Sequence, residues 1–301
     1  MIDRYIQFLG LEQTKKLLEA NERPLLPSIR INTLKITSEE LNIRLKDKGF
    51  ELEPIEWIPN GFNVLKEPMN LGSLHEYLYG YYYLQNKASM LPAIILDPKP
   101  YEIVIDMCAA PGGKATHLAQ LMENKGALIL IDFNKNRIPA LEMNLRRLGI
   151  INSIIMNFDA INLPLLNVKA DKILLDAPCT GEGLIMQDPI RKTSKSMKDI
   201  EKMAKIQKKL LKAGLNCLKK EGCLLYSTCS IAPEENELII NAVLRDKPEF
   251  SIIKIDHQYG VDGFSEVFGK SLLEGLIKSQ RLYPHLHNTI GFFMCLIQKK
   301  N

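Results

Sequence analysis

The sequence predicts an α/β protein in which a doubly wound, mostly parallel sheet follows a small α+β unit. From residue 101 onward, short apolar stretches alternate with helical ones, which is the pattern of parallel strands joined by crossover helices. The elements before residue 80 form a unit distinct from this pattern. A chain of 301 residues is long enough for two domains, and we place them at 1–80 and 81–301.

The first unit opens with a helical lead-in over residues 1–25. Thr37 and Ser38, followed by two acidic residues, are typical of a helix start, and this helix should run for about ten residues to a stop at Gly49. Strands are predicted at 30–34, 50–58 and 61–65. Residues 74–84 are rich in Tyr, which would suit stacking on RNA bases, but we favour a helix or linker between the domains.

A turn-rich break, Asp-Pro-Lys-Pro at 97–100, marks the entry to the second domain. Short apolar strands are predicted there at 103–105, 127–131, 153–156, 172–175 and 223–226. Helices are predicted near 115–122, 137–148 and 198–218. This alternation is what predicts the parallel sheet.

The net charge of +4 is small, but basic residues are concentrated in one segment. Residues 189–220 contain eleven Lys or Arg against Asp199 and Glu201. Five lysines fall on one face of the predicted helix, opposite an apolar face: Lys198, Lys202, Lys205, Lys209 and Lys212. A solvated helix face and a surface for an anionic partner such as nucleic acid explain this pattern equally well.

Targeting and metal-binding patterns are missing from the sequence. No apolar run approaches the roughly 18 to 20 residues that a membrane span needs, and the first residues lack the pattern of a signal peptide, so we expect a cytoplasmic protein. The six cysteines show no metal-ligand spacing and should be free thiols. Cys217, Cys223 and Cys295 lie in apolar stretches and should fill the core.

Two cysteines stand apart from the others. Cys179, in Asp-Ala-Pro-Cys-Thr-Gly, and Cys229, in Ser-Thr-Cys-Ser, each follow a predicted buried strand. The carboxyl ends of strands in an open α/β sheet face the ligand crevice, so both thiols should open on one pocket. A thiolate with a lowered pKa can attack carbon. This narrows the function to covalent catalysis, redox chemistry or metal binding.

A loop of small residues follows the first strand of the predicted sheet, over Asp106–Thr116. Such a loop brings backbone amides and a helix N-terminus close to a ligand. Asp132 lies twenty residues past Gly112, where a carboxylate can accept hydrogen bonds from ribose. The loop matches neither the dinucleotide nor the P-loop pattern, so S-adenosylmethionine fits better than NAD. Asp159, taken alone, is more simply a helix cap.

Several motifs then point to one family. Asp106–Thr116, Asp176–Gly183 and Tyr226–Ser230 together resemble the Nop/Sun (RsmB/NOP) family of RNA cytosine-5 methyltransferases. Further segments are similar to the family's N-terminal part, linker and C-terminal strands, at 30–35, 82–92, 281–285 and 291–293. The resemblance therefore covers most of the chain.

The resemblance implies a Rossmann-type methyltransferase core at 81–301, preceded by a small RNA-recognition-like domain at 1–80. It implies that one loop holds the methionine part of S-adenosylmethionine, with the residues Cys108, Ala109, Ala110, Pro111, Gly112, Gly113 and Lys114. Four other positions match cofactor contacts of the family: Asp132, Arg137, Asp159 and Asp176. Cys229, not Cys179, is implied to be the nucleophile.

Cytosine C5 becomes reactive toward a methyl sulfonium once a thiolate has added to C6. We assign Cys229 to this attack, Asp176 to the N3 edge of the base, and Cys179 to product release. Lys114 is expected to orient the base or cofactor, or to depress a thiol pKa.

The compact chain resembles the archaeal tRNA enzymes most, so we expect a monomer that acts on tRNA rather than on rRNA, without a metal. A DNA cytosine-5 methyltransferase is the enzymatic alternative and would use Cys179 as its nucleophile. A non-catalytic RNA-binding assembly factor is the third alternative.

Overall fold

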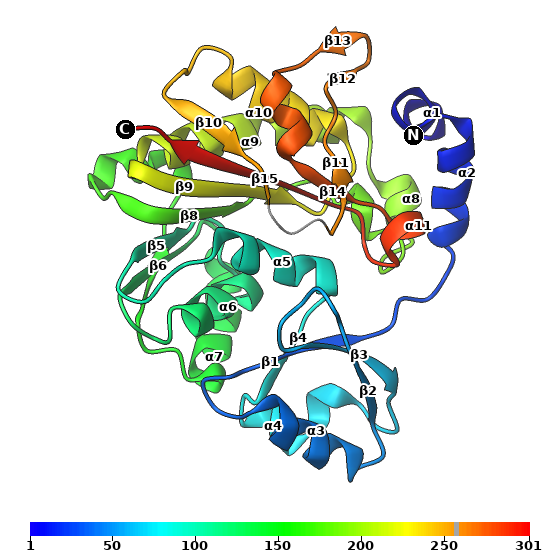
Figure 1. The fold of residues 1–301 in the computed structure, drawn as a ribbon, viewed down its shortest axis with the longest axis vertical. Helices are drawn as coiled ribbons and strands as arrows, with labels where there is room; N and C mark the ends of the chain where they lie inside the picture. The colour runs from blue at the N-terminus through cyan, green and yellow to red at the C-terminus, as the bar shows by residue number, and fades with distance from the viewer. Residues whose placement is uncertain (256–258) are drawn as a thin grey trace. The chain divides into compact units, whose positions relative to one another are not determined.

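The computed structural model describes residues 1–255 and 259–301 (Figure 1). The chain divides into two compact parts by its internal contacts. We call residues 26–174 the central part, and residues 1–25 together with 175–301 the terminal part. Each is described by itself.

The central part opens with a small antiparallel sheet in the order β2-β3-β1-β4. Its strands are β1 (Ser28–Ile31), β2 (Glu51–Pro54), β3 (Gly61–Lys66) and β4 (Tyr82–Leu84). Helix α3 (Ser38–Lys46) begins at the predicted cap, where Thr37 Oγ1 accepts a hydrogen bond from the Glu40 amide. Leu41 and Leu45 of α3 pack with Ile29 and Ile31 of β1 in one apolar core.

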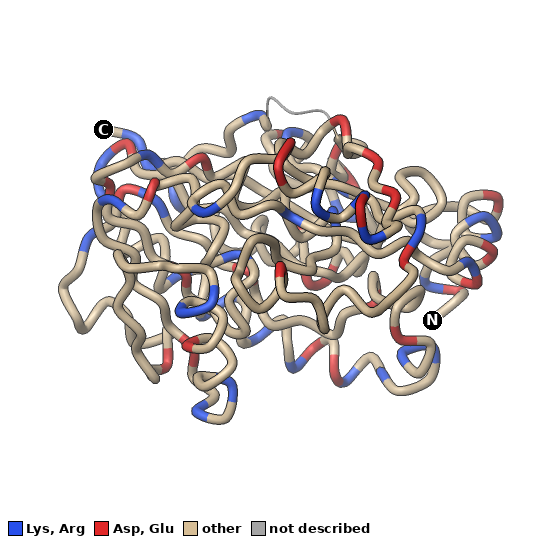
Figure 2. Tube along the Cα trace, turned by 90° about the horizontal axis from the view of Figure 1, so that it is seen from below, with Lys and Arg blue, Asp and Glu red and all other residues tan. Residues whose placement is uncertain are grey.

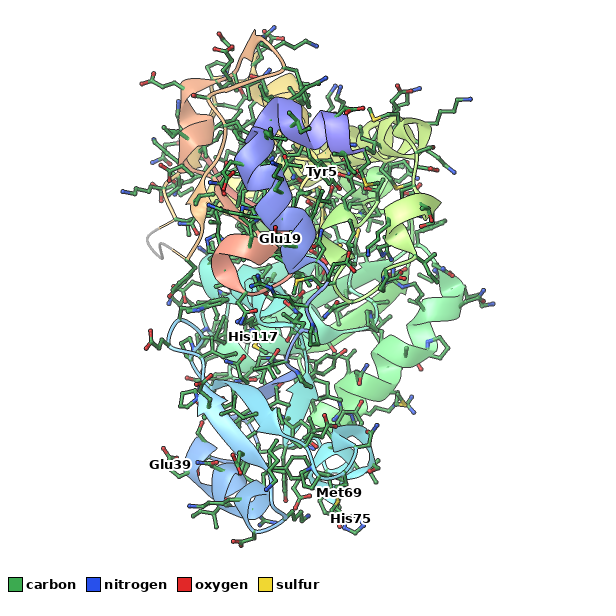
Figure 3. The ribbon with its side chains drawn as sticks, turned by 90° about the vertical axis from the view of Figure 1, so that its right-hand side faces the viewer. Tyr5, Glu19, Glu39, Met69, His75 and His117 are labelled. Carbon is green, nitrogen blue, oxygen red and sulfur yellow. The ribbon has the colours of Figure 1, made fainter. Side chains whose placement is uncertain are left out.

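Residues 74–84 match the predicted helix or linker only in part. They form the short helix α4 (His75–Leu78), which follows a 3₁₀ turn η1 (Leu71–Ser73), and then strand β4, which pairs with β1. Tyr82 is fully buried in the small core, and its hydroxyl donates to the Leu71 carbonyl. Tyr is favoured in strands, and burial of this ring against β1 stabilises the strand. The sequence indicates surface positions for His75 and His257; His75 is exposed (Figure 3), and His257 lies outside the described residues.

A parallel sheet makes up the rest of the central part, in the order β8-β5-β6-β7. Its strands are β5 (Ile103–Asp106), β6 (Ala127–Asp132), β7 (Ser153–Asn157) and β8 (Ala170–Asp176), and the division from the terminal part falls within β8. The connections are α5 (Lys87–Leu96), α6 (Gly113–Leu121), η2 (Lys135–Arg137), α7 (Ile138–Leu148) and η3 (Ala160–Leu166). The predicted strand–helix alternation is confirmed.

Buried polar side chains join the small sheet to helices α6 and α7. Arg30 of β1 is fully buried; its Nη2 donates to Thr116 Oγ1 over 2.9 Å and its Nη1 donates to Gln120 Oε1. Asn32 Nδ2 donates to the carbonyls of Gly80 and Leu148. Sequences far apart in the chain are thus held in one compact part.

The terminal part contains an antiparallel set of strands in the order β11-β14-β15-β9, with β10 also paired to β15. Its strands are β9 (Leu218–Thr228), β10 (Phe250–Ile253), β11 (Val261–Asp262), β14 (Gln280–Leu282) and β15 (Phe292–Lys299), with a separate hairpin of β12 (Glu266–Val267) and β13 (Lys270–Ser271). Strand β9 is longer than predicted at both ends, and its pairing with β15 from Cys223 to Thr228 accounts for the extension past residue 226. Cys217, Cys223 and Cys295 are buried, as predicted.

The helices of the terminal part are α8 (Arg191–Ser194), α9 (Met197–Asn216), α10 (Glu237–Leu244) and α11 (Pro284–His287), with 3₁₀ turns η4 (Glu182–Leu184), η5 (Pro233–Glu235) and η6 (Glu274–Lys278). The predicted helical lead-in forms α1 (Ile2–Leu9) and α2 (Leu11–Ala20), on which Figure 3 marks Tyr5 and Glu19. Tyr5 and Leu17 pack with Ile231 and Tyr283. The lead-in therefore belongs with the terminal part, while the domain division at residue 80 stays a prediction.

Helix α9 has the two faces predicted from its sequence. Leu210 and Gly214, on its apolar face, are buried. The five predicted lysines are all exposed: Lys198, Lys202, Lys205, Lys209 and Lys212. Elsewhere basic and acidic residues are interspersed along most of the trace (Figure 2). In the part of the chain that the structure describes, no helix is both long and apolar enough to cross a bilayer.

Candidate active site

The two singled-out cysteines lie side by side in the terminal part. Cys179 follows β8 and Cys229 follows β9, and their Sγ atoms are 3.3 Å apart. Both side chains are half-buried. We call residues 176–184 and 227–232 the cysteine loops. Two thiols at this separation can share a proton.

Backbone contacts bring the cysteine loops together. The Ala177 amide donates to the Ser227 carbonyl, and the Gly183 amide donates to the carbonyl of Cys229 over 3.0 Å. A Cβ at Gly183 would lie 2.1 Å from the Gly291 carbonyl oxygen and 2.8 Å from that of Cys229. Only glycine permits this approach.

The electrostatics of the cysteine pair are unequal. The hydrogen bond with Cys229, followed by burial, raises the pKa of the Cys179 thiol well above its ordinary value. Negative charge on Cys229, Glu235 and Asp176 acts in the same direction. Cys179 therefore retains its proton, whereas the 3.3 Å contact itself allows either sulfur to be the donor. Beside the pair, Asp176 Oδ1 accepts a hydrogen bond from Ser227 Oγ over 2.8 Å.

Two neighbouring residues on η5 and at the start of α10 hold the cysteine loops, and sequence reasoning missed them. Glu235 accepts hydrogen bonds from the amide and hydroxyl of Thr180, and Asn236 bonds Thr228 and Ser230. The sequence does carry an indication of them. The run Pro-Glu-Glu-Asn-Glu at 233–237 places polar residues shortly after Cys229, and most of these polar residues are buried.

The glycine loop, residues 106–113, lies in the central part and joins β5 to α6. The Ala109 amide donates to the Ile131 carbonyl of β6, and Asn144 Nδ2 of α7 donates to the Pro111 carbonyl over 2.9 Å. Gly112 has φ of +109°, and a Cβ there would lie 3.1 Å from Leu141 Cδ1. The loop thus needs glycine at this point, and Asn144 is a second residue that the sequence did not reveal.

The remaining residues of the glycine loop were also predicted from the sequence. The Cys108 amide donates to Asp106 Oδ1. Gly113 begins α6, and a Cβ there would lie 3.1 Å from the Tyr83 ring. Lys114 is half-buried in the first turn of α6. Burial raises the pKa of the Tyr83 hydroxyl, and the positive charge of Lys114 acts against this increase.

Asp132 closes β6 beside this loop and is 3% exposed. Its carboxylate accepts hydrogen bonds from the Ala110 amide at 3.1 Å, the Asn134 amide at 2.9 Å and Arg137 Nη1 at 3.1 Å. Arg137 also donates to the Ala110 carbonyl. Asp159 is exposed and caps η3 through the Ile161 amide, which is the simpler role that its sequence position indicated.

The predicted site residues therefore fall into two groups. Asp176, Cys179 and Cys229 belong to the cysteine loops of the terminal part. The glycine loop, Asp132, Arg137 and Asp159 belong to the central part. Within residues 1–255 and 259–301, no three His, Cys, Asp or Glu side chains gather as a metal site.

Comparison with known proteins adds the family. Residues 93–298 match the family described as 16S rRNA methyltransferase RsmB/F, and residues 1–87 match the N-terminal domain of 16S rRNA methyltransferase RsmF. The chain belongs to the RsmB/F methyltransferase family. This confirms the family that the sequence motifs indicated.

Two curated relatives and one solved structure illustrate the similarity. The mouse 28S rRNA (cytosine-C(5))-methyltransferase is 37% identical over 99% of this chain and 38% of its own length. The tRNA (cytosine(72)-C(5))-methyltransferase of Pyrococcus horikoshii is 42% identical over 76% of this chain and 55% of its own length. This chain thus spans about two fifths to a little over half of these relatives.

The structure of NSun6 from Pyrococcus horikoshii with SFG, an S-adenosylmethionine analogue, is 30% identical. It superposes with a TM-score of 0.89 over 100% of this chain and 97% of that one. The predicted α/β methyltransferase fold is confirmed, and so is the S-adenosylmethionine-dependent class of the RsmB/F family.

The residues of this chain fit such a cofactor. An ionised carboxylate offers about four acceptor positions, and Asp132 uses three of them, so one is left for a ribose hydroxyl. Small side chains at Ala109, Ala110, Gly112 and Gly113 leave the backbone of the glycine loop approachable. The N-terminus of α6 adds helix amides at the end of this loop.

Proposed function

We propose that this protein is an S-adenosylmethionine-dependent RNA (cytosine-5)-methyltransferase that works through a covalent bond between Cys229 and C6 of the base. The observation that carries the proposal is the pair of thiols 3.3 Å apart, of which Cys179 holds the proton. A protonated partner stabilises Cys229 as the thiolate, which is the form that attacks carbon. The family of the chain supports the same reaction.

The thiolate of Cys229 adds to C6, and the electron pair of the C5–C6 double bond shifts onto C5 and toward N3, whose edge Asp176 contacts. The bound cofactor supplies an electrophilic methyl group for C5. Removal of the C5 proton then restores the double bond and expels Cys229 as a thiolate. While Cys229 is bonded to carbon, Cys179 gives its own proton to water, and as a thiolate it then accepts the C5 proton, directly or through a water molecule.

The raised pKa of Cys179 explains why Cys229 attacks the base before Cys179 removes a proton. Cys229 raises the pKa of Cys179 because it accepts the hydrogen bond and carries negative charge. Once the sulfur of Cys229 is bonded to carbon, that charge is gone, so Cys179 loses its proton more easily. Cys179 becomes a base only after the adduct has formed.

The cofactor half of the reaction belongs to the central part. The glycine loop, with Cys108 and Lys114, holds the methionine part of the cofactor, and Asp132 binds the ribose. Arg137 and Asp159 complete the cofactor contacts, together with Asp176. Asp159 is the weakest member of this set because it already caps η3 and is exposed.

RNA is the substrate, and we propose tRNA before rRNA. The predicted N-terminal domain of residues 1–80 is the RNA-binding domain in this proposal, and the lysines of α9 contact the phosphate backbone. Relatives of both kinds exist, a 28S rRNA enzyme and a tRNA enzyme. A cytoplasmic location and a monomeric state stay predictions.

The decisive experiment measures transfer of a labelled methyl group from S-adenosylmethionine to unmodified tRNA and rRNA transcripts, followed by bisulfite sequencing. Wild-type protein should produce 5-methylcytosine, and Cys229→Ala should abolish it. Full turnover by Cys229→Ala would reject the mechanism. Methylation of DNA through Cys179 would favour the DNA enzyme, and binding without methyl transfer would favour an assembly factor.

A further inference from the structure

The segment that follows Cys229 returns to both cysteine loops. Pro233–Glu235 form η5, and Asn236 precedes helix α10. Glu235 and Asn236 are both 0% exposed, so neither side chain can contact RNA or solvent in this structure. Their polar atoms are directed at the residues that flank the two thiols.

Glu235 holds the loop of Cys179. Its Oε1 accepts from the Thr180 amide at 2.8 Å, and its Oε2 accepts from the Thr180 hydroxyl at 2.6 Å. Gln207 Nε2 of α9 donates both to Glu235 Oε1, at 3.2 Å, and to the Pro178 carbonyl, at 2.9 Å. The residues before and after Cys179 are thus tied to one carboxylate, and hydrogen bonds to a charged acceptor are the strong ones.

Asn236 holds the turn of Cys229. Its Oδ1 accepts from Thr228 Oγ1 at 2.6 Å, and its Nδ2 donates to the Ser230 carbonyl at 2.8 Å. Thr228 and Ser230 are the residues on either side of Cys229, and both are 0% exposed. One amide therefore clamps the nucleophile's turn from both sides.

We propose that Glu235 and Asn236 are positioning residues that divide the covalent cycle between them. Asn236 sets Cys229 for attack on C6, and Glu235 sets Cys179 for release of the methylated base. This inference rests on the proposed function, since it assigns each residue to one step of that cycle. Two adjacent residues acting on opposite loops also fix the distance between the two sulfur atoms.

The two roles predict opposite changes in the covalent RNA–protein adduct. A defect in release lets the adduct accumulate, whereas a defect in attack prevents it from forming. Displacing a reacting group by about 1 Å costs up to about a hundredfold in rate, so we expect about a tenfold loss of turnover in each case. A purely structural role would lower folded protein without changing the share of enzyme found as adduct.

The test compares Glu235→Ala, Asn236→Ala and the matched control Glu237→Gln on the tRNA or rRNA transcript that wild type methylates faster. Glu237 is equally buried, but its carboxylate pairs with Arg281 and not with a residue next to Cys179 or Cys229. Glu235→Ala should raise the adduct fraction on denaturing gels, and Asn236→Ala should slow adduct formation about tenfold. Glu237→Gln should lower the melting temperature and leave the ratio of adduct to turnover unchanged.

Conservative variants guard against misfolding. Glu235→Gln keeps an oxygen for the Thr180 amide and should restore most of the turnover. Asn236→Asp keeps the acceptor for Thr228 but loses the donor to Ser230, so adduct formation should remain slow in this variant. The inference is overturned if the Glu235 and Asn236 variants change the adduct in the same direction, or only as the control does. If wild type transfers no methyl group to RNA, the proposed function fails, and the inference falls with it.

Discussion

Nη2 of Arg30, on the first strand of the small sheet, donates a hydrogen bond of 2.9 Å to Oγ1 of Thr116 on α6. The guanidinium is fully buried, and it also bonds Gln120 and the backbone carbonyl of Gly113. Gly113 ends the glycine loop. Arg30 thus connects the small sheet to the helix that follows the loop in which we propose the cofactor binds.

We expect Arg30→Met to destabilise the protein by about 3 kcal/mol, because it leaves buried acceptors on Thr116 and Gln120 without their donor. Urea unfolding monitored by fluorescence measures this change. Arg44→Met is the control, since Arg44 is exposed, pairs with Glu40 on the surface of α3 and lies over the Tyr81 ring; its effect should stay within about 1 kcal/mol. Equal losses in both variants would contradict the assigned role of Arg30.

The cysteine pair makes a separate prediction about the covalent intermediate. Cys179→Ala should still allow Cys229 to attack, but it removes the group that we assign to product release. A covalent RNA–protein adduct should therefore accumulate and be visible on denaturing gels. Cys217→Ala, at a buried cysteine of the core, is the control and should show no accumulation. An adduct that forms through Cys179 in Cys229→Ala would reverse the assignment.

Asp132 should govern cofactor affinity. Asp132→Asn weakens a charge-assisted hydrogen bond to ribose, so we expect about a tenfold loss of affinity for S-adenosylhomocysteine. Calorimetric titration measures the dissociation constant. Asp159→Asn should lose less affinity, about twofold, because Asp159 is exposed and already caps η3. If Asp159→Asn loses more affinity than Asp132→Asn, our ranking of the two carboxylates is wrong.

The lysine face of α9 should contribute to RNA binding through phosphate contacts. Lys202→Gln with Lys205→Gln removes two exposed charges and should reduce the slope of log affinity against log salt by about 1.4. Filter binding at several salt concentrations gives this slope. The control variant, Lys15→Gln with Lys16→Gln, removes two exposed charges from α2 instead of α9. An unchanged slope in the α9 variant would identify this face as merely solvated.

Acid should destabilise the protein through His117, which lies on α6 (Figure 3). Burial, followed by the charge of Arg30, holds the pKa of His117 well below its ordinary value of 6.5. A His with a lowered folded pKa contributes stability that is complete above pH 6.5 and is lost as the pH falls below it. Urea midpoints between pH 8 and about pH 5 should fall in wild type and fall less in His117→Leu. The exposed His75→Gln variant should follow wild type.

Short-range patterns in the sequence determined much of the site. Alternating apolar and helical stretches predicted the parallel sheet, and the spacing from Gly112 to Asp132 predicted which acid would close β6 beside the glycine loop. Thr37 predicted its own helix cap, because capping involves residues only three positions apart. The positions of Cys179 and Cys229 after strands predicted that the two thiols would meet.

Tertiary structure decided the strand pairings and the long-range side-chain contacts, which local sequence patterns do not predict. Residues 82–84 became strand β4 because β1 pairs with them, and β9 was lengthened by pairing with β15 near the end of the chain. Glu235 reaches Thr180, 55 residues earlier, and Arg30 reaches Gln120, 90 residues later. Such contacts leave no periodicity in the sequence, since a buried polar side chain is defined by a partner that only folding brings to it.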